Sequence, residues 1–498
     1  MSTSLSFRTR HDPSFCSEAA RPWILIAAIL ASALGFIDGS IVSIALPAMR
    51  EDLGATLAQA TWISNGYMLP LSALILVGGA AGDRFGLVRV FGIGIIVFVA
   101  ASIICALAPT PEVLIAGRAL KGIGAALVVP GSLALIARAY PKAERGRAIG
   151  FWAASSALTT ALGPILGGAL LSFGGEAAWR LIFAINLPFG LFVLWILRAK
   201  VGQDRPLTDD GLDWIGAALI SLSLGLGAWA LTLLIAGDDA SLSPALLGTG
   251  AALALILFLA QEARARHPMM PLHLFADTRF SAANLATFCL YFALGAILFY
   301  QPMTVIAGWG YSELAASAAF APLSVFIGFL SGWVGGLADR VGPGKLVATG
   351  SALVAISFAG HAITAPLEAF WTLTVPLNCL MGFGMALVVG PLSTAVMASA
   401  TDETTGAASG INNAISRMAG LIAVAAMGSV AAGVYAGPAS FGAEADLPGH
   451  SEATNAAFAA IAWITAALSG IAAIVAWLGI AGRSEDDGSD AGQTEDVI

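Results

Sequence analysis

The chain has 498 residues, of which 58% are hydrophobic and 11% are charged, and its mean hydropathy is +0.85. This composition excludes an ordinary soluble globular protein and predicts an all-α polytopic membrane protein. The formal net charge of -8 belongs to loops and tails, so it does not indicate a nucleic-acid partner.

Residues 1–22 form a polar tail of mixed charge with no cleavable signal, and the first apolar run begins at Trp23. A segment needs roughly 20 apolar residues to cross a bilayer core of about 30 Å. Fourteen such segments are expected, near residues 23–47, 57–81, 87–108, 111–138, 147–172, 178–198, 211–236, 243–262, 280–306, 315–337, 344–365, 368–396, 406–435 and 454–480. An even number of spans places both termini on the same side of the membrane.

The basic residues predict which side that is. Eighteen of the 23 Lys and Arg residues fall in the tails and in loops on the side of the termini, whereas only Arg50 and Arg180 fall in loops on the other side. Because cytoplasmic loops carry an excess of Lys and Arg, we expect a multi-pass protein of the inner (plasma) membrane with cytoplasmic termini. The three remaining basic residues fall inside spans: Arg118, Lys121 and Arg417.

Asp38 lies in the first span, inside the otherwise uncharged stretch 34-LGFIDGSIVSIALP-47. A carboxylate in hydrocarbon costs several kcal/mol unless it is compensated. At about 1.5 Å per residue, Asp38 lies level with Arg118 and Lys121 of the fourth span, which share one helix face. Two interpretations remain open: the three residues carry proton coupling, or they form a fixed structural ion pair.

A short pattern occurs twice, as 79-GAAGDRFGLVR-89 after the second span and as 335-GGLADRVGPGK-345 after the tenth. Both copies fit G-x-x-x-D-R-x-G and lie 256 positions apart in short loops on the side of the termini, as expected of a transporter built from two related halves. The residues of the pattern are candidates for a conformational switch: Gly79, Asp83, Arg84, Gly86, Gly335, Asp339, Arg340 and Gly342.

In this loop the sequence resembles the major facilitator superfamily, whose signature is the same G-x-x-x-D-R-x-G followed by basic residues. The first copy departs from it, because Leu87 and Val88 stand where basic residues are usual. The resemblance implies two six-helix bundles, at 23–200 and 271–480. The linker 201–270 then carries two additional spans, and an acidic cytoplasmic tail occupies 481–498.

The fifth span, 150-GFWAASSALTTALGPILGG-168, narrows the resemblance. Gly150, Gly163, Pro164 and Gly167 stand at the spacing of G-x8-G-x3-G-P-x2-G, which in this superfamily is characteristic of exporters that exchange substrate for protons. Thr159 occupies one glycine position. A purely structural explanation is a helix bent by its proline and packed closely through small residues.

Fourteen spans, together with IDGSIVSIALP in the first and 62-WISNGYMLP-70 in the second, resemble the fourteen-span branch of the drug:proton antiporters. In the fourth span this family has an arginine and, three residues later, a glutamine; Arg118 fits, whereas Lys121 replaces the glutamine. With lysine in place of glutamine at position 121, the fixed ion pair is favoured more in this chain than in a typical member of the family.

Aromatic, amide and charged side chains in the spans are candidates for a substrate cavity, although most aromatic residues in spans serve packing or the membrane interface. The candidates are Trp62, Asn65, Tyr67, Tyr291, Tyr300, Gln301, Asn378 and Arg417. The tenth span contains no acid, which argues against a dedicated site for dications there.

The sequence predicts proton-coupled export of small organic compounds, drugs or toxic metabolites, by alternating access. The alternatives are a proton-coupled metabolite importer of the same fold and a membrane sensor. No enzyme is expected, because no nucleophile and base pair, metal-ligand cluster or phosphate loop is evident, and no cofactor or metal is predicted. The expected partners are a small-molecule substrate, protons and the lipid bilayer, while a periplasmic adaptor is neither indicated nor excluded.

Overall fold

The protein is described from a computed structural model. It describes residues 16–141, 176–202, 213–236, 243–266, 268–319, 321–399, 405–437, 439–442 and 447–481, together with Gly211 and separate positions within 142–175. In this part of the chain, thirteen helices are long and apolar enough to cross a membrane, and each corresponds to one predicted span. The remaining prediction, 147–172, is described only in part, and its longest continuous described stretch is 165–172.

The N-terminal half runs back and forth through long helices. They are α1 (Arg21–Leu53), α2 (Leu57–Phe85), α3 (Leu87–Ala106), α4 (Pro111–Ala139), α6 (Trp179–Ala184) and α7 (Asn186–Lys200). The pair α6 and α7 forms a single apolar segment, Trp179–Lys200. We call the side on which α1 begins the terminal side, and the other the opposite side.

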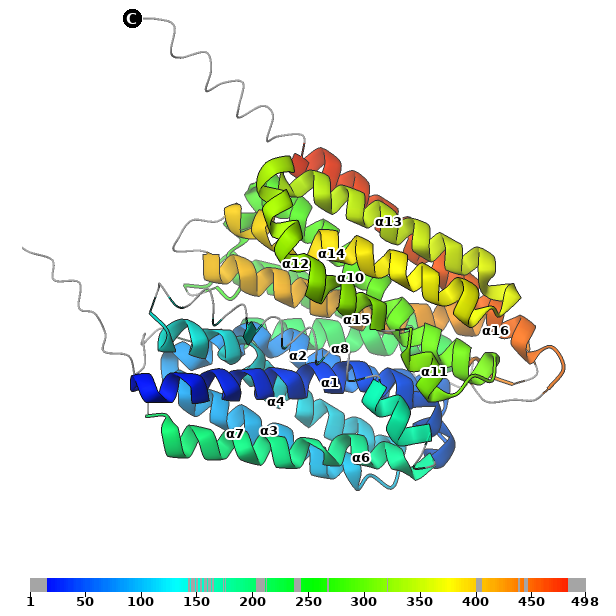
Figure 1. Cartoon of the computed structure of the whole chain (residues 1–498), viewed down its shortest axis with the longest axis horizontal. Coiled ribbons are helices and arrows are strands. Elements are labelled where there is room, and N and C mark those ends of the chain that lie inside the picture. Colours follow the sequence, from blue (N-terminus) through cyan, green and yellow to red (C-terminus); the bar gives the residue numbers. More distant parts are fainter. Residues whose placement is uncertain are drawn as a thin grey trace, which may run out of the picture.

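The C-terminal half repeats this arrangement. Its helices are α10 (Thr278–Met303), α11 (Glu313–Ser317), α12 (Ala321–Val341), α13 (Pro343–Thr364), α14 (Val375–Ala398), α15 (Thr405–Val434) and α16 (His450–Ala476). The two halves form separate helical bundles that lie side by side, one running from blue to teal and the other from green to red (Figure 1).

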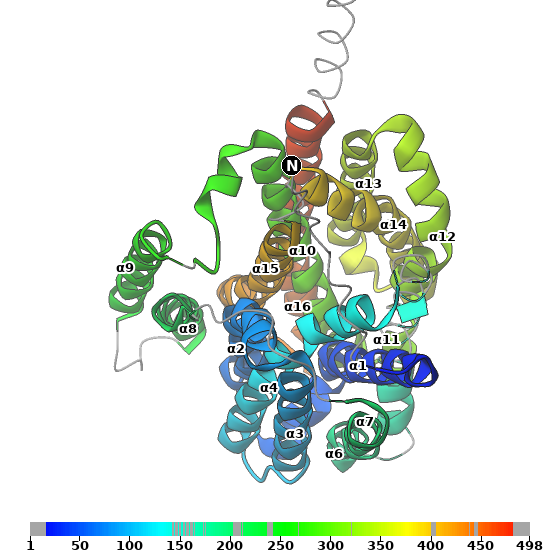
Figure 2. The ribbon, with the colours of Figure 1, turned by 90° about the vertical axis from the view of Figure 1, so that its left-hand side faces the viewer.

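Two further helices connect the halves, α8 (Trp214–Ala236) and α9 (Pro244–Glu262). They pack against each other, and α8 contacts α2 and α15, so this hairpin touches one helix of each bundle. Viewed from the terminal side, the hairpin lies at the flank of the molecule, with α9 outermost (Figure 2). Only 17% of the apolar stretch of α9 is buried inside the protein, which suits contact with lipid.

Glycines allow the closest helix contacts, and corresponding contacts occur in both halves. A side chain at Gly94 of α3 would begin 3.0 Å from the carbonyl oxygen of Gly124 in α4, and one at Gly350 of α13 would begin 2.5 Å from that of Gly384 in α14. Gly94 and Gly350 are 256 positions apart, as are the two copies of the loop pattern. Helix association in a membrane depends on such close van der Waals packing.

The two loop copies also adopt the same backbone. Gly86 separates α2 from α3 with φ 94°, and Gly342 separates α12 from α13 with φ 89°. Residues with a Cβ atom rarely adopt such angles, so glycine permits an immediate reversal between two spans. The guanidinium of Arg84 lies 5.4 Å from the Phe85 ring, whereas Arg340 is exposed.

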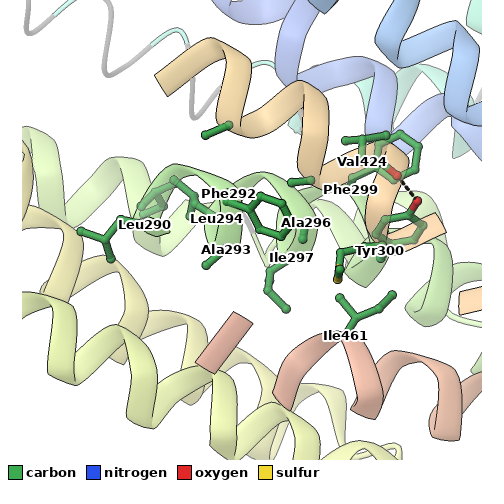
Figure 3. Packing of buried hydrophobic residues seen from close by; sticks show 14 of the residues in the cluster. Leu290, Phe292, Ala293, Leu294, Ala296, Ile297, Phe299, Tyr300, Val424 and Ile461 are labelled. Atoms are coloured by element: carbon green, nitrogen blue, oxygen red, sulfur yellow. Dashed lines mark hydrogen bonds between the residues drawn. The ribbon is translucent and has the colours of Figure 1, made fainter. Parts of the chain in front are cut away.

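The largest hydrophobic cluster joins the two bundles on the opposite side of the molecule. Helix α10 lies within it and contributes buried residues such as Leu290, Ile297 and Tyr300 (Figure 3). The Tyr300 hydroxyl donates a 2.6 Å hydrogen bond to the Val424 carbonyl of α15. This cluster holds the bundles together where the molecule is closed.

Candidate functional site

Asp38, Arg118 and Lys121, which the sequence places at the same depth, are in direct contact. Lys121 Nζ lies 2.5 Å from Asp38 Oδ1, and Arg118 Nη1 donates to Asp38 Oδ2. All three residues are at most 1% exposed. Each carboxylate oxygen therefore has its own cationic partner in this conformation, and the cluster carries a net charge of +1 when all three groups are ionised.

The two bases are held by further contacts from the N-terminal bundle. Arg118 Nε donates a 2.9 Å hydrogen bond to the Ile63 carbonyl, and its guanidinium carbon lies 4.4 Å from the centre of the Tyr67 ring. Lys121 Nζ lies 4.6 Å from the Phe98 ring and 4.8 Å from the Phe183 ring. Cation–π contacts with buried rings are worth about 2 kcal/mol or more when the cation is desolvated.

A cavity of 1320 Å³ lies between the two bundles. Its wall includes Gly79 near the end of α2, Met397 at the end of α14 and Ser409 near the start of α15, all on the terminal side. Deeper in the molecule the wall is formed by residues such as Tyr67 and Gly420. The cavity thus opens on the terminal side and ends near the middle of the spans.

Three of the eight predicted cavity residues line this space: Tyr67, Tyr291 and Arg417. Tyr67 belongs to α2, Tyr291 to α10 and Arg417 to α15, so both bundles contribute polar groups to the wall. Tyr67 also contacts Arg118, so its ring connects the buried ion cluster with the cavity.

The other five predicted cavity residues are not part of its wall in this conformation. Asn65 is completely buried on α2, and neither of its amide atoms has a hydrogen-bond partner. Trp62 is partly buried on the same helix. Tyr300 lies in the hydrophobic cluster described above.

Gln301 and Asn378 belong to a buried polar network in the C-terminal bundle. The Asn378 side-chain amide donates a 3.2 Å hydrogen bond to Gln301 Oε1, and Asn378 Oδ1 lies 3.0 Å from His361 Nε2. The network joins α10, α13 and α14, and it satisfies polar groups that would otherwise be costly to bury.

Of the antiporter pattern, Gly150 and Pro164 lie outside the described residues, whereas Gly163 and Gly167 are buried. A side chain at Gly167 would begin 2.3 Å from Cγ1 of Ile41 in α1. One at the adjacent Gly168 would begin 2.7 Å from the Glu313 carbonyl oxygen of α11. The small residues of this span therefore permit close contact with both bundles.

Arg50 closes the opposite side, a role that was not predicted from the sequence. It is 8% exposed and lies at the end of α1. Arg50 Nη1 donates a 3.0 Å hydrogen bond to the Phe441 carbonyl, and Nη2 donates to Ser440 Oγ at 3.2 Å. Its position as one of only two basic residues predicted in loops on this side was the available signal.

A second contact joins the bundles on the same side. Ser172, which follows the antiporter pattern, donates a 3.3 Å hydrogen bond to the Glu313 carboxylate.

Burial lowers the pKa of Arg50 to about 10, so this residue still carries its charge at neutral pH. The opposite side is thus closed by the hydrogen bonds of Arg50 and Ser172 as well as by apolar packing.

No cluster of three or more His, Cys, Asp and Glu residues that could hold a metal ion occurs within the described ranges. The four cysteines are free thiols. The arrangement provides a space large enough for a small compound and a buried carboxylate, Asp38, whose charge is compensated by two cations.

The sequence profile described as Major Facilitator Superfamily matches residues 28–425. The methylenomycin A resistance protein of Bacillus subtilis (strain 168) is 34% identical over 414 residues, which cover 81% of this chain and 87% of that protein. The multidrug resistance protein Stp of Mycobacterium tuberculosis (strain CDC 1551 / Oshkosh) is 32% identical over 418 residues, covering 82% of this chain and 75% of that protein.

The tetracenomycin C resistance and export protein of Streptomyces glaucescens is 29% identical over 434 residues, covering 85% of this chain and 80% of that protein. Among solved structures, a D-xylose-proton symporter superimposes with a TM-score of 0.65 at 16% identity, covering 92% of this chain and 97% of that one. A bacterial homolog of the human lysosomal transporter Spinster, in an inward-facing conformation, gives a TM-score of 0.62 at 17% identity and covers 93% and 97%. At these identities the structures show a shared fold.

Proposed function

The chain belongs to the Major Facilitator Superfamily, and from this premise we propose that it exports small organic compounds across the inner (plasma) membrane in exchange for protons. The single observation that carries the mechanism is the cavity between the bundles, which is open on the terminal side and closed on the opposite side. The direction of transport is supported by relatives that are named as resistance and export proteins.

The membrane orientation follows from the distribution of basic residues. With eighteen Lys and Arg residues predicted on the terminal side against two on the opposite side, the terminal side is cytoplasmic. The conformation described above is then the one that takes up substrate from the cytoplasm. Movement of the 23–200 bundle against the 271–480 bundle opens the other side in turn.

In this proposal Asp38 carries the proton, and Arg118 and Lys121 hold its charge while it is ionised. Their contacts support an ionised carboxylate in the cytoplasm-open conformation. Proton uptake then belongs to the conformation that is open on the other side, where breaking the ion pair frees the carboxylate. The alternative of a purely structural cluster predicts no proton exchange at this residue.

The loop residues of the repeated pattern, and Gly150, Gly163, Pro164 and Gly167 in the fifth span, are proposed to govern the change between conformations. Support comes from the positive φ of Gly86 and Gly342 and from the close packing at Gly167. The hairpin α8 and α9 is proposed to lie outside this moving core, because it packs at the flank of the molecule and takes no part in the contacts that close the opposite side.

The test is accumulation of a panel of exported compounds in cells that lack other exporters, with and without a protonophore. We expect the native chain to lower accumulation and the protonophore to abolish the effect. Asp38→Asn should abolish proton-driven export while still allowing exchange of labelled for unlabelled compound. Undiminished proton-driven export by this variant would disprove the role of Asp38, and uptake driven by an inward proton gradient would favour the importer.

A further inference from the structure

The charges inside the membrane do not balance. Away from the ends of the predicted spans, the chain contains one acid, Asp38, and three bases, Arg118, Lys121 and Arg417. The structure pairs both oxygens of Asp38 with Arg118 and Lys121. Arg417 is therefore left without a carboxylate at this depth, and a buried cation is costly unless something compensates for it.

Arg417 lines the cavity itself, so its compensation can come from what the cavity binds. Its Nε atom is buried and has no hydrogen-bond partner, and no described acid forms an ion pair with this residue. A guanidinium presents its donors in a planar fork that matches the two oxygens of a carboxylate. An unused donor at this position is suited to an anionic group of a ligand.

The part of the cavity around Arg417 is polar, whereas the rest of its deep wall is apolar. Tyr67 and Tyr291 line the same cavity, and Asn413 and Ser416 line it from the same helix as Arg417. The rest of the deep wall is largely apolar, with residues such as Leu71, Leu294 and Leu298. This combination fits an amphipathic molecule with an apolar body and one anionic end.

The mouth of the cavity does not favour ligands of either charge. Asp213 and Arg266 both line it on the terminal side, so one charge of each sign is present there. Discrimination by charge therefore depends on the deep position, where Arg417 is cationic and where water is less able to screen it.

We propose that the cavity selects small amphipathic compounds that carry an anionic group, a carboxylate or a phenolate, which binds Arg417 between Tyr67 and Tyr291. This inference specifies the substrate class of the proposed function. A cationic compound of the same shape is disfavoured, because it would bring a like charge to Arg417 without displacing the bases that already surround Asp38.

Binding to the full-length purified protein in lipid nanodiscs tests this proposal without any proton gradient. The probes are 2-naphthylacetate, 2-naphthylethanol and 2-naphthylethylammonium, which share a ring and differ in charge, and empty nanodiscs serve as the blank. We expect the anion to bind most tightly and the ammonium most weakly. Arg417→Gln should weaken binding of the anion by about tenfold or more, whereas Arg417→Lys should retain the preference for the anion.

A second variant keeps the test decisive if Arg417→Gln does not fold. Asn413 is exposed and lies one helical turn before Arg417, so Asn413→Asp places a carboxylate within reach of it. This variant should also abolish the preference for the anion. Absence of saturable anion binding to the native chain, tighter binding of the ammonium, or an unchanged preference in a folded variant would overturn the proposal. Because no gradient is used, these outcomes are independent of whether export is coupled to protons.

Discussion

Lys121 Nζ lies 2.5 Å from Asp38 Oδ1. Lys121 stands at the sequence position where the antiporters that this chain resembles have glutamine. The contact changes the meaning of substitutions at Asp38. Removing the acid alone leaves Arg118 and Lys121 as two buried cations in a space that is shielded from water. Loss of activity in such a variant can therefore arise from lost stability as well as from lost coupling.

The first prediction separates these two effects by a double substitution. Asp38→Asn should lower the free energy of unfolding by about 3–5 kcal/mol, because it leaves buried charge uncompensated. Asp38→Asn with Lys121→Gln restores the net charge of +1 and should recover most of that loss. Thermal unfolding in detergent measures the stability, and proton-driven export measures the coupling.

The double variant is decisive because the two interpretations predict different results. If Asp38 carries the proton, the double variant is stable but does not couple export to protons. If the cluster is only structural, recovery of stability should be accompanied by recovery of proton-driven export. Lys121→Gln alone, which keeps Asp38 with Arg118, is the matched control.

The second prediction concerns the closed contact at Arg50. Arg50→Gln removes the charge from the hydrogen bonds to Phe441 and Ser440, and hydrogen bonds to charged groups contribute about 1.5–3 kcal/mol. The equilibrium should shift toward the conformation that is open on the opposite side. Spin labels on the exposed residues Thr56 and Ala439 should report a longer mean distance in this variant.

Arg50→Lys is the control for this experiment, since it keeps the charge but loses the forked geometry, and it should give an intermediate shift. A distance distribution in Arg50→Gln that matches the native chain would show that the apolar cluster alone maintains closure.

Gly442, with φ 72°, belongs to the same contact, because a side chain there would begin 2.9 Å from Arg50 Nη1.

The third prediction is a pH dependence of stability at the opposite side. The hydrogen bond from Arg180 holds the pKa of the Asp52 carboxyl below its usual value, with a further contribution from Trp179. An acid whose pKa is lowered in the folded state stabilises that state at pH values above its usual pKa of about 4. This contribution to stability is lost as the pH falls further. The contact should thus weaken in acid.

Thermal unfolding of the native chain and of Asp52→Asn measures this effect. The difference in unfolding temperature between them should be constant near neutral pH and should shrink below about pH 4. The effect is small, because both side chains are partly exposed and solvent screens the pair. A difference that stays constant into acid would exclude the ion pair as its source.

The sequence predicted the spans well because each depends on a local property, a run of apolar residues. It also predicted the depth of Asp38 relative to Arg118 and Lys121, since helices advance by a constant rise. It could not predict Arg50, whose acceptor Phe441 lies 391 positions away. Contacts of this kind depend on how the two bundles pack, which no local pattern specifies.

Helix α10 illustrates the same limit within the cavity. Tyr291 and Tyr300 were both candidates, but nine residues correspond to about two and a half helical turns, so the two side chains point to opposite faces. Tyr291 lines the cavity, whereas Tyr300 packs in the hydrophobic cluster. Residue type alone selected both, and the helical period decides that only one can face the cavity.

The fourth prediction follows from the proposed anionic substrate. Export of a monoanion in exchange for one proton moves the equivalent of two positive charges inward in each cycle. A membrane potential contributes about 2.3 kcal/mol per charge for each 100 mV, so a potential that is negative on the cytoplasmic side should strongly favour export. A neutral substrate would gain half as much, and a monocation in 1:1 exchange would gain nothing.

Proteoliposomes that contain potassium, with valinomycin to set the potential, allow this comparison at a fixed pH difference. We expect transport of 2-naphthylacetate out of the compartment that faces the terminal side to accelerate as that compartment becomes more negative. Arg417→Gln should transport the anion poorly, and 2-naphthylethanol should respond to the potential about half as steeply. Transport of 2-naphthylacetate that responds to the potential no more steeply than transport of 2-naphthylethanol would show that the compound crosses as the neutral acid, in which case Arg417 does not hold its charge during transport.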